Sequence, residues 1–180
     1  MEVSSYFIRS LTRLDDAFLW GMLYHVIYVP EGTDPLPRSI VSNPEIARYV
    51  ENWWRIGDFG FAAVRTLDSS AVGAVWGRLF AAGCQGYGYV DDETPELAIA
   101  VLPAYRGRGI GTALLMNLIR DAEPRYPALS LSVSSNNPAV RLYERLGFEV
   151  VERSRASQIM IKKFCLSDRQ RSKERPRCCT

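Results

Sequence analysis

The stretch Tyr105-Arg106-Gly107-Arg108-Gly109-Ile110-Gly111-Thr112 decides the fold of this 180-residue chain. It follows an apolar run typical of a strand, 97–101, and it opens a run with helical periodicity, 112–122. Three glycines at the start of a helix let several backbone N–H groups approach one anion, because no Cβ atom blocks the way and the helix dipole favours negative charge. Arg106 and Arg108 add two positive charges. The stretch therefore predicts a phosphate-binding turn, and the alternative is a tight strand-to-helix turn without a ligand.

Two familiar phosphate-binding motifs do not fit this turn. A P-loop needs a Lys-Ser or Lys-Thr pair after its glycines, and none follows here. A dinucleotide-binding fingerprint has the pattern G-x-G-x-x-G in an early βαβ unit, with an acid about 20 residues further on. Here the glycines form G-x-G-x-G past the middle of the chain, and residues 128–134 contain no acid. A different kind of phosphate-containing ligand is therefore indicated.

A second segment, Asn136-Asn137-Pro138-Ala139-Val140-Arg141-Leu142-Tyr143-Glu144-Arg145-Leu146-Gly147-Phe148, has the pattern of a short helix. Its asparagines can cap the helix, Pro138 suits the first turn and Gly147 suits a left-handed end. Together the two stretches resemble the GCN5-related N-acetyltransferase (GNAT) superfamily. Its signature is R/Q-x-x-G-x-G/A, followed about 30 residues later by N-x-x-A-x-x-L-Y-x-x-x-G-F. The resemblance covers about residues 6–165.

The coarse pattern of the chain predicts a mixed-sheet α/β domain over residues 1–166, followed by a basic, flexible tail over 167–180. The expected element order is β-α-α-β-β-β-α-β-α-β-β. The resemblance implies a GNAT-type central sheet that splays apart between strands 4 and 5. The expected strands are 6–9, 60–66, 71–80, 96–101, 128–133, 148–153 and 158–164. The expected helices are 12–26, with Leu14, Phe18, Met22, Leu23 and Val26 on one face, and 43–54, 112–123 and 138–147.

The overall composition is that of an ordinary globular protein, with 47% apolar and 23% charged residues. The formal net charge of +2 is too small to indicate nucleic-acid binding, although residues 168–180 hold five Lys/Arg and two acids. No apolar run is long enough for a membrane span, and residues 1–5 lack the pattern of a secretion signal. We therefore expect a cytoplasmic protein with neither a nucleic-acid nor a membrane partner.

The cysteines do not form a metal-binding pattern. They are Cys84, Cys165, Cys178 and Cys179, without a C-x-x-C pair, and the chain has one histidine. No metal site is therefore expected, and the cysteines should be reduced in the cytosol.

The resemblance implies acetyl-CoA as cosubstrate. The turn would hold its pyrophosphate, and the edge of the fourth strand would bond the pantetheine arm like an added strand. The Val101 N–H would also lie near the acetyl carbonyl, where it could stabilise an oxyanion. The cofactor-binding residues implied in this way are Ile99, Ala100, Val101, Arg106, Gly107, Arg108, Gly109, Ile110, Gly111, Thr112, Asn136 and Tyr143. Asn136 could equally be only a helix cap.

Two residues are candidates for the proton transfers of acyl transfer to an amine. Tyr143 matches the family's tyrosine that protonates the departing sulfur, and a phenol is a suitable donor to a thiolate. Its alternative role is packing. Family members often place a glutamate at the start of the fourth strand as the base, which indicates Glu96, with Glu93 and Asp92 shortly before it. The alternative for Glu96 is a solvent-exposed charge at a strand end.

The acceptor pocket is expected to form from the first two helices, their connecting loop and the loop 81–95. Aromatic residues with a few acids could hold an amine there by cation–π contact and charge. The contributing residues would be Trp20, Tyr24, Tyr28, Glu31, Trp53, Trp54, Tyr87 and Tyr89, although most of the tryptophans could instead be core. His25 could line the pocket, but a surface or core-edge position is the expected one.

The resulting hypothesis is an N-acetyltransferase that moves an acetyl group directly from acetyl-CoA to a primary amine of a small molecule or peptide in a ternary complex. The alternative is a non-catalytic acyl-CoA-binding or regulatory module on the same fold. Homodimers are common in the resembled family, so a homodimer is possible here.

Overall fold

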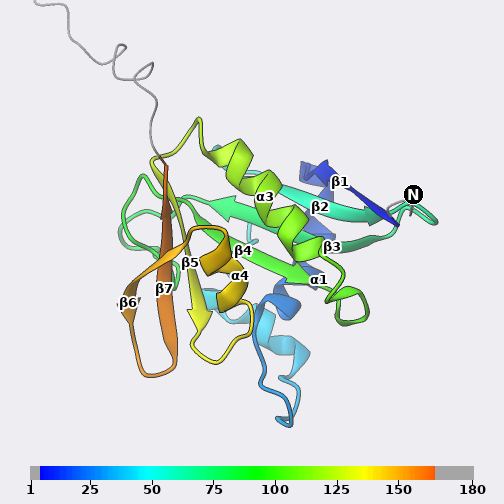
Figure 1. Cartoon of the computed structure of the whole chain (residues 1–180), viewed down its shortest axis with the longest axis horizontal. Coiled ribbons are helices and arrows are strands. Elements are labelled where there is room, and N and C mark those ends of the chain that lie inside the picture. Colours follow the sequence, from blue (N-terminus) through cyan, green and yellow to red (C-terminus); the bar gives the residue numbers. More distant parts are fainter. Residues whose placement is uncertain (1–4, 165–180) are drawn as a thin grey trace, which may run out of the picture.

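Strands form one mixed sheet in the computed structural model, which describes residues 5–164. The seven strands of this described part lie in the order β1-β2-β3-β4-β5-β7-β6 (Figure 1). Neighbouring strands are antiparallel except β4 and β5, which are parallel. The strands are β1 Tyr6–Ser10, β2 Phe59–Arg65, β3 Ala71–Arg78, β4 Glu96–Val101, β5 Ala128–Ser134, β6 Glu149–Arg153 and β7 Ser157–Lys163. The predicted α/β element order is confirmed.

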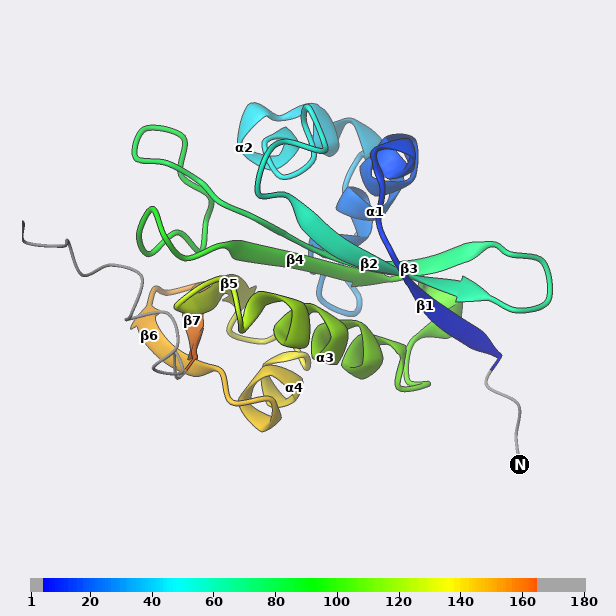
Figure 2. The same cartoon turned by 90° about the horizontal axis from the view of Figure 1, so that it is seen from above.

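Helices cover both faces of the sheet. Helices α1, Asp16–Val26, and α2, Pro44–Ala47, lie on one face, and α3, Ile110–Ala122, and α4, Val140–Arg145, lie on the other (Figure 2). Short 3-10 turns add η1 Arg13–Asp15, η2 Arg38–Ser42 and η3 Pro103–Tyr105.

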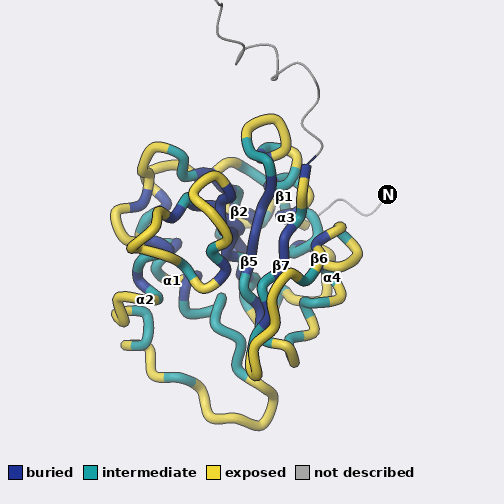
Figure 3. The backbone as a smooth tube through the Cα atoms, turned by 90° about the vertical axis from the view of Figure 1, so that its left-hand side faces the viewer, coloured by how far each residue is buried: buried dark blue, intermediate teal, exposed yellow. Residues whose placement is uncertain are grey.

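Apolar side chains fill both interfaces between helices and sheet. On the α3 side, Leu114, Leu115 and Leu118 are fully buried, at the spacing of one helix face. On the α1 side, Leu19 and Leu23 are buried against the other face of the sheet. The buried residues consequently gather along the central strands, between exposed connecting loops (Figure 3).

The sheet opens between β4 and β5, as predicted. Their ladder contains one register pair, Glu96 with Ser130. Beyond it the two strands run in different directions (Figure 1). Because β4 stays fully paired with β3 and β5 with β7, the opening is a wedge between two otherwise regular halves of the sheet.

The first two helices begin or end differently from the sequence-based expectation. Leu14 is 85% exposed because the chain first makes the 3-10 turn η1. Thr12 and Asp15 form a capping box there, so the expected cap at Thr12 is confirmed although the apolar assignment of Leu14 is wrong. Helix α2 is one turn long, and the chain after it continues in turns, with left-handed backbone angles at Asn52 and Trp54.

Some expectations concern residues that the structure does not describe. The basic tail 167–180 and Cys165, Cys178 and Cys179 lie outside the described residues. Within 5–164, Cys84 is free and exposed. No helix in this described part is long and apolar enough to cross a membrane.

Candidate active site

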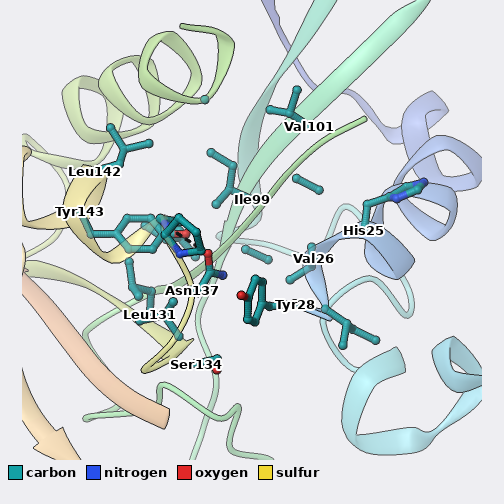
Figure 4. Close-up of a pocket in the computed structure, with 18 of the residues that line it drawn as sticks. His25, Val26, Tyr28, Ile99, Val101, Leu131, Ser134, Asn137, Leu142 and Tyr143 are labelled. Carbon is teal, nitrogen blue, oxygen red and sulfur yellow. Dashed lines mark hydrogen bonds between the residues drawn. The ribbon is translucent and has the colours of Figure 1, made fainter. Parts of the chain in front are cut away.

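A cavity of about 980 Å³ occupies the wedge between β4 and β5. Residues from β4, β5, α4, the turn before α3 and the segment that follows α1 line it (Figure 4). The volume lies at the upper end of the range typical of small-molecule sites. The opened sheet therefore provides a cavity that reaches from the glycine-rich turn to the start of β4.

The glycine-rich turn has the backbone geometry that the sequence indicated. Gly107 has φ +74° and Gly109 has φ +78°, so both adopt left-handed angles that other residues rarely adopt. A Cβ atom at either position would meet nothing within 4 Å, so backbone conformation rather than packing selects glycine here. Gly109 is the N-cap of α3 and offers no capping side chain. The first amides of α3 are therefore not bonded by a cap, which suits an anion.

Arg106 is anchored beside this turn. Its Nε donates a hydrogen bond to the Val101 carbonyl oxygen at 2.9 Å, at the end of β4. Both residues line the cavity. The contact places a permanent positive charge where the strand ends and the turn begins.

Most of the predicted cofactor-binding residues line the cavity. These are Ile99, Ala100, Val101, Arg106, Gly107, Gly109, Ile110, Gly111, Thr112 and Tyr143. Arg108 is not among them; its guanidinium lies 5.5 Å from the Tyr105 ring centroid. Asn136 is exposed outside the cavity wall, whereas Asn137 lines the cavity and accepts a hydrogen bond from the Ala139 amide at 2.9 Å. The sequence left only the helix cap open between the two asparagines and assigned the cofactor contact to Asn136.

Glu96 is buried in the cavity wall, so the alternative of a solvent-exposed charge is wrong. It is 2% exposed. Its Oε1 accepts hydrogen bonds from the Tyr49 hydroxyl at 2.6 Å and the Gly88 amide at 2.8 Å. Oε2 has no hydrogen-bond partner among the described residues. Burial raises the pKa of Glu96 from 4.5 to about 7, against the opposing effect of these two hydrogen bonds and of Arg48.

Two glycines let the loop 81–95 close over Glu96. A Cβ atom at Gly86 would collide with Glu96 Oε2 and lie 2.8 Å from the Tyr49 hydroxyl. A Cβ at Gly88 would lie 2.6 Å from the backbone of Leu131. Glycine at both positions is what allows the loop to shield the carboxylate from water.

Strand β3 holds the main chain around Tyr49. The Trp76 Nε1 donates to the Tyr49 carbonyl at 3.0 Å. Arg78 donates to the carbonyls of Arg48 at 2.7 Å and Glu51 at 2.9 Å. Arg78 also forms a 2.6 Å ion pair with Asp58, and both side chains are only 2% exposed. The buried ion pair thus fixes the segment that carries the partner of Glu96.

Sequence reasoning missed Tyr49 as a functional residue. It lies within the helix expected over 43–54, and the sequence indicated no role for it beyond the apolar side of that helix. In the structure it is 8% exposed, packs edge-to-face on Phe80 and stacks on Tyr87. Burial and the neighbouring Glu96 carboxylate raise the pKa of Tyr49 far above its ordinary value, so its hydroxyl stays protonated and donates. No local pattern in the sequence links Tyr49 with Glu96.

Tyr143 faces the cavity from α4. Its ring is 6% exposed and packs edge-to-face against Phe148, with 6.0 Å between ring centroids. Figure 4 shows the side chain directed into the cavity. Burial raises the pKa of Tyr143 above its ordinary value, and no hydrogen bond from the described residues contributes. Its hydroxyl is therefore a protonated donor that the described part of the protein leaves available.

Only part of the expected acceptor set reaches the cavity. Tyr28 and Tyr87 line it. Trp53 is core and donates from Nε1 to the Thr12 carbonyl at 2.9 Å, and Trp54 is 49% exposed elsewhere. The remaining residues of that set, Trp20, Tyr24, Glu31 and Tyr89, do not line the cavity.

His25 lines the cavity and is half-buried, which agrees with the expected core-edge position. Burial lowers its pKa, and the charges of Arg38 and Arg106 lower it further. A neutral imidazole is therefore favoured there.

Comparison with known proteins agrees with this architecture. The sequence profile described as the acetyltransferase (GNAT) family matches residues 28–148. An L-2,4-diaminobutyric acid acetyltransferase of Nocardia farcinica is 34% identical over 113 residues, which are 59% of this chain and 50% of that protein. The [ribosomal protein bS18]-alanine N-acetyltransferase of Escherichia coli K12 is 49% identical over 59 residues, 32% of this chain and 40% of that protein. The chain thus spans at most half the length of these curated relatives.

Solved structures share the fold over nearly the whole chain. A putative acetyltransferase from Salmonella typhimurium, solved with its cofactor acetyl-CoA, superposes with a TM-score of 0.64 at 20% identity. The match covers 98% of this chain and 100% of that one. The PaiA N-acetyltransferase of Thermoplasma acidophilum, solved in complex with coenzyme A, superposes with a TM-score of 0.60 at 21% identity. This match covers 89% of the present chain and 99% of the PaiA chain.

Proposed function

This chain belongs to the acetyltransferase (GNAT) family, and from that membership we propose that it transfers an acetyl group from acetyl-CoA to a primary amine of a small molecule or peptide. The transfer is direct, with both substrates bound together. The observation that carries the proposal is one cavity that joins the glycine-rich turn, Tyr143 and the buried Glu96. A cytoplasmic location and a homodimer stay predictions from the sequence.

The residues at the wide end of the wedge fit acetyl-CoA. The left-handed glycines leave open space beside the uncapped amides of α3, and Arg106 adds positive charge. Such a turn binds a diphosphate. The edge of β4 around Ile99 and Val101 borders the cavity, so its backbone is placed to bond an amide-rich arm as an added strand. When bound, acetyl-CoA supplies an acetyl thioester.

Glu96 and Tyr143 carry the two proton transfers in this proposal. Glu96 takes a proton from the incoming ammonium, and a pKa near 7 suits a base that must be ionised and yet basic at neutral pH. The amine nitrogen then forms the new C–N bond as the C–S bond breaks. Tyr143 donates its hydroxyl proton to the departing sulfur, and solvent restores the proton to the phenolate. The acceptor nitrogen loses two protons in all: the one taken by Glu96 is released to solvent, and the one lost as the amide forms balances the proton gained at the thiol.

The burial of Glu96 favours an enzyme over a non-catalytic acyl-CoA-binding module. A carboxylate with one unpartnered oxygen in a covered site lowers stability, and binding of the carrier alone does not need it. A carboxylate that exchanges a proton during turnover gives this burial a catalytic use, which supports the proposal of an enzyme.

The substitution Tyr143→Phe tests the proposal. It removes one hydroxyl and keeps the ring that packs on Phe148. Turnover, followed by thiol release, should fall by about 100-fold or more, while coenzyme A affinity measured by calorimetry stays within about twofold. Unchanged turnover in an active preparation would remove Tyr143 as the acid. Coenzyme A binding without thiol release from any amine, in the unaltered protein, would favour the binding module.

A further inference from the structure

The cavity near Glu96 is lined mainly by apolar and aromatic side chains. Ile46 and Tyr87 lie beside the Tyr49–Glu96 pair, and Tyr28 and Val29 come from the segment after α1. Figure 4 shows the Tyr28 side chain reaching into the cavity. Among the lining residues in the described part of the chain, Glu96 is the one acid.

The other acids expected near the acceptor stay outside the cavity wall. Glu45 is exposed, and its Oε2 accepts a hydrogen bond from the Tyr87 hydroxyl at 2.9 Å. Glu31 is exposed and does not line the cavity. A second ammonium group inside the wedge would therefore find no further carboxylate on the walls that the structure describes.

The charged groups that do line the cavity are mostly cationic. Arg106 is bound to Val101, at the end of β4 opposite Glu96, which is roughly 17 Å away along a strand. Arg145 is the other permanent cation of the described lining, and His25 is favoured as the neutral imidazole.

The energetics separate two classes of amine. The first ammonium can pair with Glu96, the one carboxylate among the lining residues that the structure describes. Each further ammonium would lose its hydration without a charge partner on these walls, which is unfavourable. An apolar substituent instead gains free energy from the surface that it buries, and the Tyr28 and Tyr87 rings offer large contact areas.

We infer that the acceptor is an amine with a single positive charge whose remaining part is apolar or aromatic, and that polycationic amines are poor acceptors. The inference rests on the proposed function and names its substrate class. The same chemistry occurs in free alkyl or arylalkyl monoamines and in peptide amino termini that begin with an apolar residue.

The test compares four acceptors with the unaltered full chain and acetyl-CoA. The acceptors are 2-phenylethylamine, phenylalanyl-alanine amide, agmatine and spermidine. Thiol release should give a kcat/KM for at least one of the first two that is about tenfold or more above both polycations. Which of the first two is preferred identifies the source of the amine, and either result supports the inference.

Two outcomes would overturn the inference, and they are distinguishable. Spermidine or agmatine used as well as the monoamines would refute the substrate class and leave the acetyltransferase function standing. Thiol release with none of the four, although coenzyme A binds, would refute the proposed function and the inference with it.

A pair of variants at Ile46 tests the electrostatic cause. Ile46→Glu adds a second carboxylate to the cavity lining, in the first turn of α2 where an acid is favourable. Ile46→Gln is the matched neutral control. The ratio of kcat/KM for spermidine to that for 2-phenylethylamine should be about tenfold higher with Glu than with Gln, a difference of about 1.4 kcal/mol. An equal ratio in two folded variants would contradict the charge argument, and the comparison of acceptors with the unaltered chain does not depend on either variant.

Discussion

The Tyr49 hydroxyl donates a 2.6 Å hydrogen bond to Glu96 Oε1, between residues 47 positions apart in the chain. The same hydroxyl accepts a hydrogen bond from the Tyr87 amide at 2.7 Å. Tyr49 therefore connects α2, the loop 81–95 and β4 at one point. It leaves Oε2 as the oxygen of Glu96 without a partner among the described residues. In the proposed mechanism Tyr49 is a positioning residue for the base.

Tyr49→Phe should move the acidic limb of the pH profile of kcat/KM to higher pH. The lost hydrogen bond stabilises the charged carboxylate, so its removal raises the pKa of Glu96 above about 7, while Arg48 and the Gly88 amide still act on it. Tyr126→Phe is the matched control, because its hydroxyl bonds to Gly57 outside the cavity. An unshifted limb, with only a uniform loss of rate, would indicate a purely structural role.

Glu96→Gln should abolish most activity and yet stabilise the protein in alkaline solution. The folded pKa of about 7 lies above the ordinary 4.5, so the native state binds more protons between these values. Stability of the unaltered protein therefore falls as pH rises from 4.5 through 7 and stays lower above it. The expected penalty, about 3 kcal/mol, should be missing in the variant. Urea unfolding at pH 5 and pH 8.5 measures it; a difference between the proteins that does not change with pH would refute the raised pKa.

Arg78→Met should destabilise the fold by about 3–5 kcal/mol, because it leaves the buried Asp58 carboxylate without its charge partner. The exposed Arg65–Asp68 pair supplies a control, and Arg65→Met should cost less than about 1 kcal/mol. Free energies of unfolding from urea titration make the comparison. Equal, small losses would mean that the Arg78 pair does not hold the segment around Tyr49.

Gly111→Val should weaken coenzyme A binding by about tenfold or more, measured by calorimetry. Its backbone angle is ordinary, and a Cβ there would meet only Leu142 Cδ2 at 3.8 Å, so the fold tolerates a side chain. The new branch lies beside the first amides of α3, where it obstructs an anion. Gly109 is a poorer choice for this test, because its positive φ strains any substitute. Unchanged affinity would refute the role of the turn.

Gly21→Ala is the stability control for that experiment. Gly21 lies exposed inside α1, and a Cβ there would meet nothing within 4 Å. Alanine should raise the free energy of unfolding by about 0.5–1 kcal/mol, because it lowers the entropy of the unfolded chain, and should leave coenzyme A binding unchanged. A lower melting temperature in the variant would contradict this expectation.

Local patterns in the sequence were sufficient where local geometry decides the structure. The strand Glu96–Val101, the start of α3 within the glycine-rich turn and the glycine that follows α4 at Gly147 are set by neighbouring residues. They were insufficient where distant residues decide it. The chain after Ala47 had the apolar spacing of a longer helix, but Arg78 takes the carbonyls of Arg48 and Glu51 as acceptors.

The candidate site likewise has a part that could be predicted from the sequence and a part that could not. The turn and Tyr143 belong to motifs, so their positions on the cavity were predictable. The raised pKa of Glu96 was not predictable, because it depends on Tyr49 and on the close approach of Gly86 and Gly88 to the carboxylate. These contacts exist only after α2 and the loop 81–95 have packed together.

The lone register pair of Glu96 with Ser130 joins two leaves of sheet, β1–β4 and β5–β7–β6. Since no second rung pairs β4 with β5 in the described part of the chain, residues of both strands beyond this pair border the cavity instead of each other. Helix α3 packs against strands of both leaves and holds them together. The division of the sheet thus places the carboxylate at the closed end of the opening, with the glycine-rich turn at the other end.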